Sequence, residues 1–203
     1  MGVDLRNLEE VEQKLISAEI DFRLPTIFLS ECVLVYIEPK YSIPLLKWFS
    51  SKFENAAFVN YEQDPAPFNS VHQTCHWFLC MISYEDLLFE LHSPLDTRWS
   101  AISLLYLIPE VNMNDRFSSV MLSNLRARGC SLAGVDFCLS LETQKNRFLS
   151  TGWSGCRAWD MIQVYQSISA SDRHRIERLE MLDEGELLVQ LFQHYCLVVA
   201  WKV

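Results

Sequence analysis

The apolar positions near the start of the chain change from a helical period to a strand-like run. Leu8, Val11 and Leu15 share one face of a predicted helix over residues 7–19, and acidic residues fill the other face. A short apolar run over residues 26–29 follows and predicts a strand. The chain therefore opens with a helix followed by a buried strand.

The same alternation continues to residue 61. Pro39 suits the first turn of a helix, and residues 39–53 carry apolar side chains at helical spacing. A second short apolar run, residues 56–61, predicts another buried strand. Helix, strand, helix and strand with short links imply two parallel strands joined by a right-handed crossover. The fold class predicted is α/β.

The pattern breaks over residues 64–110. Prolines and histidines concentrate in this segment, and its apolar clusters keep neither a helical nor a strand period. We predict an irregular insertion. The spacing of His72, Cys75, His76 and Cys80 is not that of a common zinc module, and no second ligand pair follows, so we expect no metal.

Regular signals resume after the insertion. Asn114 is predicted to cap a helix that Gly129 ends, a second helix is predicted over residues 140–151, and a third begins at Asp183. A last strand is predicted over residues 196–201. The expected apolar stripes of the first and third helices are Phe117, Val120, Met121 and Leu125, and Leu187, Leu188, Leu191 and Phe192. The predicted parts of the chain are 1–63, 64–110 and 111–203.

Composition narrows the classes of function. The 203 residues carry a formal net charge of -9, which argues against nucleic acid and an anionic membrane surface as partners. No apolar run is long enough for a membrane span, and the N-terminus does not resemble a signal peptide. Seven scattered cysteines then favour reduced thiols in the cytoplasm. Sequence motifs of serine hydrolases, P-loop proteins, zinc proteases and dinucleotide-binding proteins are missing.

Two carboxylates are the best candidates for a binding site. Glu31 follows a buried strand, and Asp4 stands 27 residues earlier, before the first helix. In an open α/β sheet both would face the same edge, where a carboxylate accepts hydrogen bonds from a ribose, an amino group or an adenine amine. The alternative is that Asp4 caps the following helix and Glu31 is a solvated loop acid. Tyr36 has its own alternative, a core residue with a solvated hydroxyl.

Several segments closely resemble the second half of leucine carboxyl methyltransferases. The resemblance covers about three quarters of the chain and resumes after the predicted insertion. The segments that carry it are MGVDLRNL (1–8), LPT (24–26), ECVLVY (31–36), LLKW (45–48), VNYEQ (59–63), NMNDRF (112–117), LAGV (132–135), SLETQK (140–145) and the stretch 182–196.

The resemblance implies an incomplete Rossmann-like fold that uses S-adenosylmethionine (S-adenosyl-L-methionine), without its N-terminal strands and with added helices. The family methylates the C-terminal leucine carboxylate of the protein phosphatase 2A catalytic subunit. By resemblance, Asp4 lies beside the adenine through its side chain and Leu5 through its backbone. Glu31 lies against the cofactor, and Tyr36 lies near the terminal leucine of the substrate. We expect a monomer and no catalytic residue, because a terminal carboxylate is already ionised at pH 7.

The chain also departs from the family pattern. The Gly-rich cofactor loop, the acidic residue that binds the ribose and the basic residues that meet the substrate carboxylate have no counterpart in the sequence. Removing residues 64–110 joins Gln63 to Val111 and restores the family pattern. We therefore expect this chain to be impaired as an enzyme. The alternative function is a non-catalytic variant that binds the phosphatase or is unstable.

Overall fold

The computed structural model describes residues 2–63, 116–179 and 185–203. All of these residues belong to one compact unit. The predicted insertion, its four metal-like residues and the predicted caps Asn114 and Asp183 lie outside the described residues.

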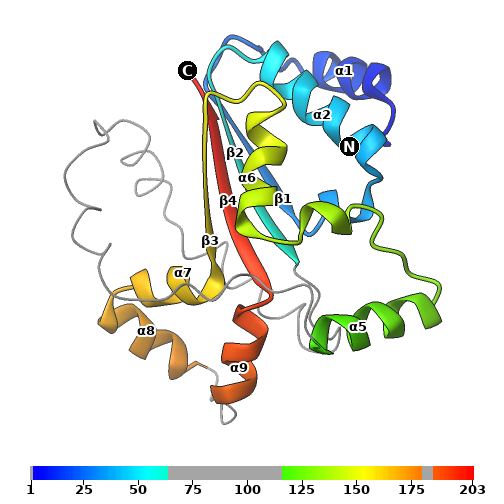
Figure 1. The fold of residues 1–203 in the computed structure, drawn as a ribbon. Coiled ribbons are helices and arrows are strands. Elements are labelled where there is room, and N and C mark those ends of the chain that lie inside the picture. Colours follow the sequence, from blue (N-terminus) through cyan, green and yellow to red (C-terminus); the bar gives the residue numbers. More distant parts are fainter. Residues whose placement is uncertain (1, 64–115, 180–184) are drawn as a thin grey trace. The chain divides into compact units, whose positions relative to one another are not determined.

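Helices and strands of the described chain form an α/β fold (Figure 1). In chain order, with η marking a 3-10 helix, they are α1 (Leu8–Ser17), β1 (Thr26–Glu31), η1 (Leu34–Tyr36), α2 (Pro39–Lys52), β2 (Ala56–Gln63), α5 (Arg116–Ala127), η2 (Val135–Phe137), α6 (Leu141–Leu149), β3 (Gly155–Asp160), α7 (Met161–Ser167), α8 (Ala170–Glu177), α9 (Gly185–Phe192) and β4 (Tyr195–Lys202). The predicted α/β class is confirmed.

The four strands form one mixed sheet in the order β1-β2-β4-β3. Strands β1 and β2 are parallel, as predicted, and α2 connects them. Strand β4 runs antiparallel to both of its neighbours, β2 and β3. The sequence predicted β4 but not β3, so the part 111–203 contributes two strands to the sheet instead of one.

Local sequence signals explain the first two helices. The Asn7 side chain caps α1 by accepting a hydrogen bond from the Glu10 backbone N–H at 3.3 Å. Pro39 occupies the first turn of α2. On α2, Leu45, Leu46 and Phe49 are buried at helical spacing and pack in the main core. Both helices are confirmed.

The main core lies on one face of the sheet, beneath α2 and α6. The Phe58 ring on β2 is at its centre, with ring centroids 6.1 Å from Phe49, 5.3 Å from Phe148 and 5.7 Å from Trp153. Strand β2 is buried on both faces, which explains why its sequence is a continuous apolar run at its start. The face of β2 that carries Phe58 also carries two buried polar residues, Asn60 and Glu62.

The two predicted apolar stripes are partly wrong. On α5, Met121 is buried as predicted, whereas Val120 is 53% exposed and Ser118, which was not predicted, is buried. Leu187 of α9 is 56% exposed, whereas Phe192 at the end of that helix is buried. Apolar periodicity thus identified both helices and most of their buried faces, with one exposed residue in each predicted stripe.

Candidate functional site

The chain reverses direction sharply after β1. Cys32 adopts a left-handed conformation, with φ 50°, which is uncommon for a residue with a side chain. Its backbone N–H donates a 2.7 Å hydrogen bond to the Tyr61 carbonyl on β2. The turn delivers the chain into η1, where Leu34 and Val35 are buried and Tyr36 is 41% exposed. The strand end therefore places Tyr36 at the surface on a segment anchored in the core.

A second turn, just before α1, presents Asp4 and Arg6. The Asn7 backbone N–H donates to the Asp4 carbonyl at 3.0 Å, which closes the turn. The Arg6 guanidinium donates hydrogen bonds to the Asp4 carboxylate, from Nη2 to Oδ2 at 2.7 Å and from Nε to Oδ1 at 3.0 Å. The Arg6 backbone N–H also donates to Oδ1 at 3.0 Å. Both side chains remain partly exposed, at 60% for Arg6 and 47% for Asp4.

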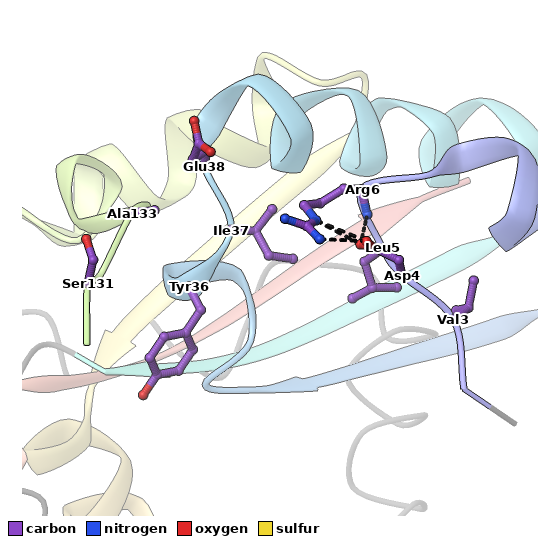
Figure 2. Close-up of a pocket in the computed structure, with 9 residues that line it drawn as sticks. All are labelled: Val3, Asp4, Leu5, Arg6, Tyr36, Ile37, Glu38, Ser131 and Ala133. Carbon is purple, nitrogen blue, oxygen red and sulfur yellow. Dashed lines mark hydrogen bonds and ion pairs between the residues drawn. The ribbon is translucent and has the colours of Figure 1, made fainter. Parts of the chain in front are cut away.

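These two turns border an open depression of about 660 Å³, within the roughly 300–1,000 Å³ typical of ligand sites. Figure 2 shows the ion pair between Asp4 and Arg6 on one side of the view and the segment with Ser131 and Ala133 on the other. The nine lining residues are Val3, Asp4, Leu5, Arg6, Tyr36, Ile37, Glu38, Ser131 and Ala133.

The depression brings together three of the four predicted site residues. Asp4, Leu5 and Tyr36 line it, and Glu31 is not among its lining residues. Glu31 is the half-buried last residue of β1, so it lies in a strand and not in a loop. The alternative that Asp4 caps the following helix is also wrong, because Asn7 caps α1.

Sequence reasoning did not identify the remaining residues of the depression. Arg6 had a usable signal, because an arginine two residues after an aspartate can fold back onto it, and Asp21 and Arg23 form the same pair at 2.8 Å. Ser131 and Ala133 gave no such signal, since they lie far from Asp4 in sequence and reach it only through the fold.

Hydrogen bonds from the Arg6 side chain and backbone lower the pKa of Asp4 to about 2. The pair is therefore intact above the ordinary Asp pKa of 3.8 and is lost as the pH falls through about 2. We expect Arg6→Gln to raise the Asp4 pKa towards 3.8 by removing the guanidinium, although the backbone N–H of residue 6 remains, so that a measurable part of the carboxyl is protonated at pH 3.8. Carboxyl ¹³C NMR measures this change.

Asp21 provides an internal control in the same spectra. Its pKa is likewise lowered to about 2, by hydrogen bonds from Arg23. Arg6→Gln should leave the Asp21 titration unchanged. An Asp4 carboxyl that is still fully ionised at pH 3.8 in Arg6→Gln would contradict the assignment of the shift to Arg6.

The described residues place three charged side chains, Asp4, Arg6 and Glu38, on the depression. None of their His, Cys, Asp and Glu side chains form a cluster of three or more that could hold a metal. No helix in the described part of the chain combines the length and apolar character needed to cross a membrane. The Asp4 carboxylate has about four acceptor sites, most of them occupied by Arg6, so a ligand amine must displace part of the exposed guanidinium.

An α/β chain with a mixed sheet flanked by helices is compatible with a methyltransferase fold. The family model of leucine carboxyl methyltransferases matches residues 1–50, about a quarter of the chain. That match includes both turns of the depression that carry Asp4 and Tyr36.

Individual relatives extend the similarity to the whole chain. Leucine carboxyl methyltransferase 1 of Bos taurus is 40% identical over 202 residues, which is 100% of this chain and 47% of that protein. Leucine carboxyl methyltransferase 1 of Caenorhabditis elegans is 34% identical, covering 98% of this chain and 46% of its own length. The tRNA wybutosine-synthesizing protein 4 of Homo sapiens is 29% identical, with 98% of this chain and 22% of that protein covered.

The chain thus spans about half the length of the leucine carboxyl methyltransferases it matches. The resemblance stated from the sequence is confirmed. Over its whole length this chain is similar to leucine carboxyl methyltransferases.

Proposed function

We propose that the chain takes part in S-adenosylmethionine-dependent methylation of the C-terminal leucine carboxylate of the protein phosphatase 2A catalytic subunit. The observation that carries the proposal is the shared depression of Asp4, Leu5 and Tyr36, within the segment that matches the family model. The identity to leucine carboxyl methyltransferase 1, at 40%, exceeds the 29% to the wybutosine protein and favours the leucine substrate.

The depression fits the adenosyl end of S-adenosylmethionine. Asp4 stays ionised at neutral pH and offers an acceptor for an amine, and the neighbouring Leu5 offers apolar surface and backbone groups. Tyr36, on η1, would contact the substrate leucine. We assign Glu31 to the cofactor side as well, from its position at the end of β1.

The proposed methyl transfer needs no general base from these side chains. S-adenosylmethionine, when bound, supplies an electrophilic methyl group on a sulfonium sulfur. The substrate carboxylate, with a pKa of about 3.3–3.7, is ionised at pH 7 and needs no general base. Asp4, Leu5 and Tyr36 then act by orienting ligands and excluding water.

We further propose that the chain by itself binds the cofactor weakly and acts as a monomer in the cytoplasm. The open depression supplies one wall, whereas tight sites bury most of the ligand. The seven cysteines are scattered along the sequence without a Cys-x-x-Cys pair, which supports a reducing compartment.

Saturation-transfer difference NMR with S-adenosylmethionine tests this site, because the method detects weak binding. We expect the adenine protons to receive saturation from the parent chain. In Asp4→Asn the saturation transferred should be at least tenfold smaller, since each lost charge-assisted hydrogen bond costs about 1.5–3 kcal/mol. The matched control is Asp21→Asn, which removes an identical Asp–Arg pair outside the depression.

Two outcomes would refute the adenine site. One is a parent chain that gives no adenine signal at millimolar cofactor. The other is equal saturation in Asp4→Asn and Asp21→Asn. Transfer of a labelled methyl group to the phosphatase, read as a base-labile ester at its C-terminal leucine, tests the activity separately.

A further inference from the structure

Arg147 on α6 lies where three elements around the depression meet. Its Nη1 donates to Glu62 Oε2 on β2 at 2.8 Å, and its Nη2 donates to the Leu34 carbonyl on η1 at 3.2 Å. Its guanidinium also lies 5.0 Å from the centre of the Phe137 ring on η2. The side chains of Arg147 and Glu62 are both fully buried. One buried guanidinium therefore joins the sheet to both 3-10 helices.

Helix η1, to which Arg147 donates a hydrogen bond, carries one side of the depression. The Leu34 carbonyl belongs to η1, whose last residue is Tyr36, and Ile37 and Glu38 follow it in the lining. Because a 3-10 helix of three residues has little hydrogen bonding of its own, external contacts decide its position. Arg147 supplies such a contact from the sheet side.

The side of the depression that carries Ser131 and Ala133 also contacts η1. The Gly134 backbone N–H donates to the Val35 carbonyl at 2.8 Å, and a Cβ at Gly134 would lie only 2.8 Å from the Leu34 carbonyl oxygen. Ser131 and Ala133 directly precede this contact and line the depression. The Tyr36 side and the Ser131–Ala133 side of the depression are thus both held by η1, which Arg147 ties to Glu62.

The ion pair is poorly built for stability alone. Within the described residues, Glu62 Oε1 and Arg147 Nε have no hydrogen-bond partner. Buried pairs of this kind can often be replaced by apolar residues without loss, because desolvation offsets the attraction. The planar fork of arginine can reach Glu62 and the Leu34 carbonyl together, which the point charge of lysine cannot.

We propose that Arg147, held by Glu62, is a positioning residue that fixes η1 and with it the Tyr36 wall of the depression. Its consequence for methyl transfer rests on the proposed function. The positioning itself is a property of the free protein, so it can be measured without any ligand.

The test places 3-fluorotyrosine at position 36 and reads its ¹⁹F resonance in the full chain. We expect Arg147→Met to shift the resonance towards that of free 3-fluorotyrosine and to narrow it, because the wall becomes mobile. Arg147→Lys is the decisive variant. It keeps a cation for Glu62, so it should retain most of the melting temperature that Arg147→Met loses, yet it should still shift the resonance because the Leu34 carbonyl contact is lost.

Met161→Ala serves as the control for general destabilisation. Met161 is buried on α7, away from η1, so its variant should lower the melting temperature and leave the resonance in place. The proposal is overturned if the Arg147→Lys resonance matches the parent, or if Met161→Ala shifts it as far as Arg147→Met. Absence of S-adenosylmethionine binding by the parent would defeat the proposed function and leave this readout unaffected.

Discussion

Glu62→Leu is expected to lower the free energy of unfolding by about 3–5 kcal/mol, because it leaves the Arg147 charge buried without its partner. The Glu62 Oε2 atom accepts from three side chains, Arg147 at 2.8 Å, Asn60 at 3.1 Å and Gln144 at 3.4 Å. All three donors are buried, so water cannot replace the carboxylate. Urea unfolding followed by circular dichroism measures the loss.

Two matched variants separate charge from shape. Glu62→Gln keeps an acceptor oxygen without the charge, so its free energy of unfolding should lie between those of the parent and Glu62→Leu. The double variant Glu62→Met with Arg147→Met removes both charges and should recover much of the stability. A double variant as unstable as Glu62→Leu would contradict this account, since the cost would then arise from packing and not from an unpaired charge.

No pattern in the sequence predicts this pair. Glu62 and Arg147 are 85 residues apart, with the predicted insertion between them. A single sequence gives helical and strand periods: Arg147 lies in the predicted helix 140–151, and Glu62 directly follows the predicted strand 56–61. Which polar residue of β2 faces which residue of α6 depends on how the helix packs on the sheet, and that information is tertiary.

The elements that the sequence predicted share a strong local signal. Strand β2 is a buried apolar run, and α2 combines a proline in its first turn with buried residues at helical spacing. Strand β3 lacks such a signal because it lies at the edge of the sheet, with only its last residue fully buried. Helix α8 buries none of its residues, so it presents no apolar stripe.

The candidate site was predictable to the extent that it is local. Asp4, Leu5 and Tyr36 lie in segments whose resemblance to leucine carboxyl methyltransferases could be read directly, and the structure places all three on one depression. The ion pair of Arg6 with Asp4 was not expected, although it governs the Asp4 pKa. Glu31 illustrates the limit, since sequence position alone could not tell whether a strand-end carboxylate lines the same depression.

Phe148→Ala is expected to cost about 3–5 kcal/mol of unfolding free energy, the range for removing a buried aromatic ring. Phe148 is 0% exposed on α6, and its ring centroid lies 5.3 Å from Phe58 and 6.1 Å from Trp153. The variant leaves a cavity among rigid rings that cannot collapse easily into it. Part of the loss is the aromatic contact itself, about 0.5–1.5 kcal/mol for each pair.

The neighbouring residue provides the control for this prediction. Leu149 follows Phe148 on α6 but is 44% exposed, so Leu149→Ala should change the free energy of unfolding by only about 0.5 kcal/mol. Both variants lose similar helical and apolar character, so their difference reports burial. Phe148→Leu should recover most of the loss, because it refills much of the cavity. Equal losses for Phe148→Ala and Leu149→Ala would mean that α6 does not pack on the sheet through Phe148.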